Sequence, residues 1–129
     1  MRNYTGLKAF ELSDELVLLI YRATENFPKQ EMFGLTNQLR RAAVSTVSNI
    51  VEGASRHSET DFLRFLDMAY GSACEVEYQV SLASRLGYIP KANYEVLQTK
   101  ASGVAKVLNG LICSLRNKNL RTEDYFSSA

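Results

Sequence analysis

The sequence of 129 residues is short of the side chains that most enzymes use, with one histidine, two cysteines and no tryptophan. Because His57 is the single histidine, a Ser-His-Asp arrangement has only one candidate base, and a di-iron centre lacks its Glu-x-x-His pairs. The sequence also contains no glycine-rich dinucleotide motif and no P-loop lysine motif. We therefore expect a non-enzymatic protein without catalytic, cofactor-binding or metal-binding residues and without a small-molecule substrate.

Cysteines and long apolar runs are scarce as well. Cys74 and Cys113 have no second cysteine at C-x-x-C spacing, so we expect two buried, inert thiols. The longest apolar run, residues 16–21, is too short to span a bilayer, and the first residues lack the order of a signal peptide. We expect a cytoplasmic protein with no membrane partner.

Periodic apolar residues predict four helices and no strands. The expected helices cover residues of about 7–26, 34–54, 59–86 and 91–117, and residues 118–129 are expected to form a flexible tail. Because the connections are short, consecutive helices should be antiparallel neighbours. The predicted fold is all-α, an antiparallel up-down-up-down four-helix bundle that forms one domain over residues 1–117.

Serine and glycine positions predict the details of the helix ends and contacts. Ser58 is placed to cap the third helix, and Gly53 and Gly87 are placed to end the second and third helices. Gly71 lies inside the third helix, where glycine costs about 1 kcal/mol relative to alanine. We therefore expect Gly71 to permit a close approach of the second helix near Ala42.

The helix over residues 34–54 carries a polar stripe beside its apolar stripe. Serine and asparagine are poor helix formers when they are merely solvated, so we expect this stripe to be hydrogen-bonded against another helix or another subunit. We expect an ion pair or a short polar network between Arg41 and Glu75. The predicted structural network consists of Arg41, Ser45, Asn49, Glu52, Arg56 and Glu75.

The first helix is apolar on every side over residues 16–21, although a helix on the surface of a monomeric bundle needs only one apolar stripe. Self-association would cover the second apolar side, with Val17, Leu18 and Tyr21 as candidate interface residues. The alternative is that the loop over residues 27–33, or the aromatic residues of the tail, folds back over this side.

Charge is distributed unevenly, although the net charge is only +1. Residues 57–90 are acidic on balance and residues 91–121 are basic, so the last helix offers a modest phosphate-binding surface. An ordinary solvated helix, or a contact with the acidic helix of another subunit, would show the same pattern. The candidate nucleic-acid contacts are Arg40, Lys100, Lys106, Arg116, Lys118 and Arg121.

Two long stretches give the sequence a specific resemblance to a known family. FPKQEMFGLTNQLRRAAVSTVSNIVEGASR and FLRFLDMAYGSACEVEYQV resemble the bacterial 23S rRNA intervening-sequence proteins, also called four-helix bundle proteins. The resemblance implies a homo-oligomer, commonly a pentameric ring of bundles, and a link to ribosomal RNA genes that carry intervening sequences. In architecture the family is similar to the accessory variability determinant of diversity-generating retroelements.

From these features and the resemblance we expect a homo-oligomeric accessory protein that associates with RNA or with a ribonucleoprotein. The alternative is a protein-protein scaffold or adaptor that binds no nucleic acid. Membership of a fold family fixes no reaction, so the choice between the two depends on the surfaces that the fold exposes.

Overall fold

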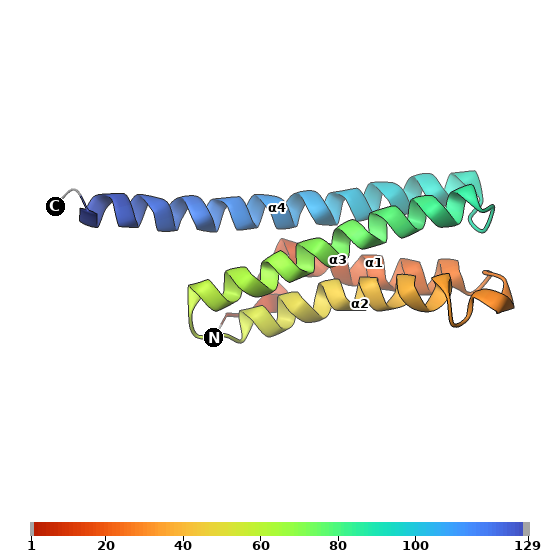
Figure 1. Ribbon diagram of the computed structural model, residues 1–129, viewed down its shortest axis with the longest axis horizontal. Coiled ribbons are helices and arrows are strands. Elements are labelled where there is room, and N and C mark those ends of the chain that lie inside the picture. Colours follow the sequence, from red (N-terminus) through yellow and green to blue (C-terminus); the bar gives the residue numbers. More distant parts are fainter. Residues whose placement is uncertain (1, 128–129) are drawn as a thin grey trace.

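A computed structural model shows four long helices packed side by side (Figure 1). It describes the backbone of residues 2–127 and the side chains of residues 2–118. The elements are η1 (Tyr4–Gly6), α1 (Lys8–Thr24), η2 (Lys29–Glu31), α2 (Leu35–Ala54), α3 (Glu59–Arg85) and α4 (Lys91–Ser127), where η marks a short 3₁₀ helix. The described residues form no strand, and the predicted all-α four-helix fold is confirmed.

Consecutive helices run in opposite directions, as the colours along the ribbon show (Figure 1). Each helix packs against its neighbours in the sequence, and α1 also packs against α4. Two ends of the bundle result. The loop end consists of residues 25–34 and 86–90, and the amino-terminal end consists of residues 2–7 and 55–58 (Figure 1).

Each of the four helices directs one apolar face inward, and the side chains of these faces form the core. The buried face of α3 repeats at alternating spacings of four and three residues, which keeps one stripe directed at its neighbours. Its members are Phe62, Leu66, Ala69, Ala73, Val76, Val80 and Ala83. Among the described residues, no helix is both long enough and apolar enough to cross a membrane.

The ends of α3 follow the prediction. The Ser58 hydroxyl accepts a hydrogen bond from the backbone N–H of Asp61 at 3.1 Å, which caps the first turn. Gly87 takes a left-handed φ of 81° and the Tyr88 N–H donates to the Ala83 carbonyl at 2.9 Å, which closes the last turn.

The end of α4 differs from the prediction. The helix continues to Ser127, whereas the sequence predicted its end at residue 117 and a tail beyond it. Residues 118–127 contain neither glycine nor proline, so nothing in this stretch stops a helix. In Figure 1 the last turns of α4 extend past the α2–α3 turn.

The close approach of α2 and α3 lies at Gly53, and the prediction for Gly71 was wrong. A Cβ atom added to Gly53 would lie 2.7 Å from the Phe65 Cβ atom and 3.3 Å from Phe62 Cδ1. Gly53 is itself helical and buried, so it does not end α2 in the predicted left-handed conformation. Gly71 faces solvent, and apart from its own stretch of α3 no described part of the chain comes within 4 Å of its Cβ position.

Both cysteines are exposed, which contradicts the buried thiols that the sequence predicted. Cys74 directly follows the buried Ala73, and Cys113 directly follows the buried Ile112. One residue turns a helix by about 100°, so each thiol lies just outside the core stripe of its helix.

Candidate functional site

The polar stripe of α2 forms a hydrogen-bonded group with α3. The hydroxyl oxygens of Ser45 and Ser72 lie 2.9 Å apart and join the two helices. The Asn49 side-chain amide donates to the Ser45 carbonyl at 2.9 Å and to the Ser45 hydroxyl at 3.1 Å. Poor helix formers therefore serve a contact between helices here, and the contact lies within one chain.

Arg41 and Glu75 lie in the same region without an ion pair. Both line a groove of about 510 Å³ between α2 and α3, and both are exposed. The ion pairs between described side chains include none that joins them, so the ion pair, one of the two predicted forms of this link, is absent there. Ser45 and Ser72, which line the same groove, make the polar contact between the two helices.

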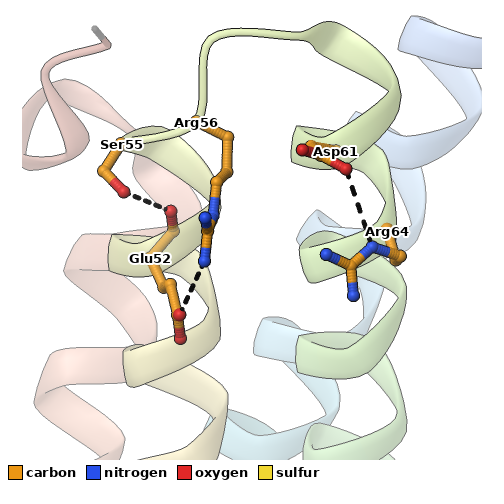
Figure 2. Close-up of polar contacts among 5 residues, drawn as sticks. All are labelled: Glu52, Ser55, Arg56, Asp61 and Arg64. Atoms are coloured by element: carbon orange, nitrogen blue, oxygen red, sulfur yellow. Dashed lines mark hydrogen bonds and ion pairs between the residues drawn. The ribbon is translucent and has the colours of Figure 1, made fainter.

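Two ion pairs flank the turn between α2 and α3 (Figure 2). Arg56 donates to the Glu52 carboxylate at 2.9 Å, and the guanidinium of Arg64 lies 3.7 Å from the carboxylate of Asp61. The Ser55 hydroxyl donates to the Glu52 carbonyl at 2.6 Å. Arg56 pairs with a carboxylate of α2 and Arg64 with a carboxylate of α3, so the turn offers no concentrated positive charge.

Arginines also cover two buried phenylalanine rings at the amino-terminal end. The guanidinium carbon of Arg2 lies 4.3 Å from the centre of the Phe62 ring, and Arg2 donates to the Arg56 carbonyl at 3.0 Å. The guanidinium carbons of Arg56 and Arg64 lie 4.8 Å and 4.7 Å from the centre of the Phe65 ring. Contacts within the chain therefore complete this end.

An apolar surface on α1 and α2 is open to solvent. Leu18, Tyr21 and Val44 are 52%, 40% and 39% exposed, whereas Val17 is partly buried against the core. Phe33 lies in the turn before the N-cap of α2, at the loop end of the bundle. We call Leu18, Tyr21 and Val44 the α1–α2 strip.

The neighbouring loop leaves the strip uncovered. Phe33 is 91% exposed and Met32 is exposed as well, whereas Phe27 is buried in the core beside Tyr88. The alternative in which residues 27–33 fold back over the strip was therefore wrong. The tail side chains proposed for the same role lie outside the described residues.

Arg40 connects α2 to the strip residue Tyr21. Its Nε–H donates to the Thr24 hydroxyl at 2.8 Å, and its guanidinium carbon lies 4.7 Å from the centre of the Tyr21 ring. α1 therefore holds the guanidinium that the sequence proposed as a nucleic-acid contact. The same contacts fix the orientation of Tyr21.

The other candidate nucleic-acid contacts lie along α4 in different settings. Lys100 donates to the Glu15 carboxylate at 3.2 Å, and Arg116 forms an ion pair with Asp67. Lys106 is exposed and has no ion pair with any described side chain. Lys118 is exposed, and the side chain of Arg121 lies outside the described residues.

A hollow of about 620 Å³ opens at the loop end, between α1, the α3–α4 turn and the start of α4. Leu19, Ala23, Tyr88, Ile89, Pro90, Val96 and Leu97 form most of its wall, and Arg22, Asn26 and Asn93 add polar groups. Burial and the nearby Glu31 carboxylate raise the pKa of Tyr88 in this wall. The sequence analysis missed the hollow, because three segments that are distant in sequence create it.

His57 and the acidic residues are the side chains to consider for a metal site. His57 is exposed in the turn between α2 and α3. Among the side chains of residues 2–118, no group of three or more histidine, cysteine or acidic residues could hold a metal ion. Hydrogen bonding, charge pairing and apolar contact are the interactions that the surfaces above can supply.

Comparison with known proteins identifies relatives of this chain. The sequence model described as 23S rRNA-intervening sequence protein matches residues 5–110. A crystal structure of a protein of unknown function from the S23 ribosomal protein family of Bacteroides thetaiotaomicron is similar, with a TM-score of 0.72 and 29% sequence identity. The similarity covers 81% of this chain and 97% of that chain. No curated protein matches the sequence significantly.

Proposed function

This chain belongs to the 23S rRNA-intervening sequence protein family, and we propose that it is a non-enzymatic, homo-oligomeric accessory protein that associates with RNA. The observation that carries this proposal is the exposed α1–α2 strip, in which Leu18 is 52% exposed in a single copy. Soluble monomers rarely expose contiguous apolar surface of this kind, and association of copies is a direct way to cover it.

Contacts within the chain hold the Tyr21 side chain of the strip in place. Arg40 holds the Tyr21 ring from one side, and both residues lie on packed helices. A side chain that is already fixed loses little conformational freedom on binding, so more of the contact energy contributes to affinity. We propose, from the family resemblance, that the assembly is a closed ring of five copies.

The family description and two lysines of α4 support the association with RNA. Lys91 and Lys106 are exposed and have no ion pair with any described side chain. A closed ring repeats these charges once per copy, so weak phosphate contacts would act together on one RNA. The near-neutral single chain would then bind RNA only in its assembled form.

A protein-protein scaffold is the second candidate, and one observation favours it. Glu15 and Asp67 neutralise Lys100 and Arg116, two of the predicted phosphate contacts. If the remaining cations are too few, the ring serves to bring proteins together without RNA. The two candidates share the α1–α2 strip and differ only in what the finished assembly binds.

Solution mass tests the assembly. By light scattering we expect a multiple of the 14.5 kDa chain mass for the wild type. Leu18→Asp should give monomers with unchanged helical circular dichroism, because it places a charge in the strip and leaves the core intact. The matched control is Tyr78→Asp, a residue 61% exposed on α3, which should keep the wild-type mass. A wild type that is monomeric at tens of micromolar would overturn the proposed assembly.

Binding of ribosomal RNA fragments across a salt series tests the partner. If phosphates are contacted, affinity should fall steeply between about 50 and 200 mM salt. Lys106→Gln should lower the affinity and flatten this dependence, whereas Lys29→Gln, an exposed lysine of the loop end, serves as the control. An intact oligomer that shows no binding at low salt would select the scaffold.

A further inference from the structure

The groove of about 510 Å³ between α2 and α3 has two walls of different chemistry. The α2 wall carries a guanidinium and two side-chain amides, whereas the α3 wall carries a carboxylate and one side-chain amide. From α2 come Asn37, Gln38, Arg41, Ala42 and Ser45, and from α3 come Ser72, Glu75 and Gln79. One wall is therefore positive and the other negative.

Polar side chains of the two walls lie at matching levels along the groove. On each helix they are spaced by three and four residues, which places them on one face. The two helices are antiparallel, and the serine hydroxyl oxygens that lie 2.9 Å apart fix which residues share a level. The three levels, in order toward the loop end, are Ser45 with Ser72, Arg41 with Glu75, and Gln38 with Gln79.

The serine level makes a direct contact across the groove, and the next two levels do not. Among the described residues, Arg41 and Glu75 form no ion pair, and the buried Gln79 Oε1 atom has no hydrogen-bond partner. In Figure 1, α2 and α3 diverge from their turn toward the loop end. A buried oxygen without a donor is unfavourable, so a ligand that supplies a donor there gains affinity.

We propose that this groove binds a free α-amino acid. The ligand carboxylate accepts hydrogen bonds from the Arg41 guanidinium, whose planar fork matches a carboxylate. The ligand ammonium has three N–H donors, which serve the Glu75 carboxylate and the Gln79 Oε1 atom. Both charged groups of an α-amino acid are attached to one carbon atom, so they can reach opposite walls of a single groove.

The size and the lining of the groove favour a small polar ligand. Ligand pockets commonly measure about 300–1,000 Å³, a range that includes this groove. Among its described lining residues Ala42 is the single apolar one, and it is buried. Affinity must then come from charge and hydrogen bonds. The site shares no residue with the α1–α2 strip or with the lysines of α4, so it goes beyond the proposed function.

Saturation-transfer NMR on the full chain tests the proposal, because it detects weak ligands of proteins in any state of assembly. The probes are the common L-amino acids, each added alone at millimolar concentration, and we expect at least one to bind. For the strongest binder, the methyl ester lacks the carboxylate charge and the N-acetyl derivative lacks the ammonium. Each should bind about tenfold more weakly or worse, since each loses a charge-assisted hydrogen bond.

Variants locate the site. Arg41→Gln and Glu75→Gln should each weaken binding about tenfold or more, with unchanged helical circular dichroism because both residues are exposed. The matched controls Arg22→Gln and Glu11→Gln remove exposed charges of α1 and should bind as the wild type does.

Three outcomes would overturn the inference. The first is that no amino acid binds, in which case water alone occupies the groove. The second is that the ester or the N-acetyl derivative binds as well as the amino acid. The third is that the Arg41 and Glu75 variants bind as the wild type does. A monomeric wild type, or one that binds no RNA, would overturn the proposed function and leave this inference standing.

Discussion

The two ends of the bundle use their aromatic side chains in opposite ways. At the amino-terminal end, Phe62 and Phe65 are buried and covered by arginines, and the backbone N–H of Arg2 donates to the Ala54 carbonyl at 3.0 Å. At the loop end, Phe33 is 91% exposed, and an apolar hollow opens at the same end of the bundle. One end is completed by contacts within the chain, and the other presents apolar surface that a single copy leaves uncovered.

The difference separates stability from assembly. Buried rings at the amino-terminal end contribute to the free energy of unfolding of each copy, because they lose their packing when the chain unfolds. The exposed ring at the loop end contributes nothing comparable in a single copy. Substitutions at the two ends should therefore affect different measurements.

The largest expected effect compares Phe65→Ala with Phe33→Ala. Phe65 is buried under two guanidinium groups, so its truncation should lower the free energy of unfolding by about 3–5 kcal/mol. Phe33→Ala should change it by no more than about 0.5 kcal/mol. Urea unfolding of both in a Leu18→Asp background, where assembly does not contribute, measures the difference. Equal losses at the two sites would remove the distinction between the ends.

A second comparison uses Gly53, which lies at the α2–α3 contact, and Gly71, which lies on the exposed side of α3. In Gly53→Ala the new methyl group would lie 2.7 Å from the Phe65 Cβ atom, so the helices must move apart, at a cost of about 1–3 kcal/mol. Gly71→Ala adds a methyl group in open space and should raise stability by up to about 1 kcal/mol, because alanine is the better helix former. Urea midpoints that shift in the same direction would contradict the assignment of the close contact to Gly53.

The sequence predicted the helices and core well because both depend on local periodicity. Apolar residues at helical spacing determine which face of α3 is buried, and the Ser58 cap and the Gly87 turn each depend on a few adjacent residues. The glycine assignment failed for a related reason. A glycine inside a predicted helix suggests a close contact with another segment. Which glycine makes that contact, Gly53 or Gly71, depends on where the two helices cross, and the sequence does not show this.

The candidate site was less predictable, because it depends on contacts between distant segments. The apolar excess on α1 identified Leu18 and Tyr21 from the sequence alone, since one helix carried two apolar sides. The partners of the charged residues could not be identified in that way. Arg40 contacts Thr24, and Lys100 contacts Glu15 across 85 positions of sequence, pairings that exist only after the bundle has formed.

A smaller effect is expected at the N-cap of α3, which belongs to the amino-terminal end. Ser58→Ala removes the acceptor for the Asp61 N–H, so the free energy of unfolding should fall by about 1 kcal/mol. Ser48→Ala replaces an exposed serine inside α2 and should leave stability unchanged or slightly higher. Oligomer mass should stay constant in both variants, and a change of mass in Ser58→Ala would link this end to assembly.

The smallest effect concerns the loop end in alkaline solution. Burial and the Glu31 carboxylate raise the pKa of Tyr88 above its ordinary value of 10.0. The unfolded chain therefore loses the phenolic proton at a lower pH than the folded chain does, and unfolding becomes more favourable as pH rises past about 10. This contribution is fully present below that pH and is lost as pH rises through the folded pKa.

Tyr88→Phe tests this dependence. The variant has no phenolic proton at this position, so its thermal midpoint should decline less than that of the wild type between about pH 9 and pH 11. Tyr78→Phe, on the exposed surface of α3, provides the matched control and should follow the wild-type curve. If Tyr88→Phe also follows the wild-type curve, burial and the Glu31 carboxylate do not raise the pKa of Tyr88 in solution.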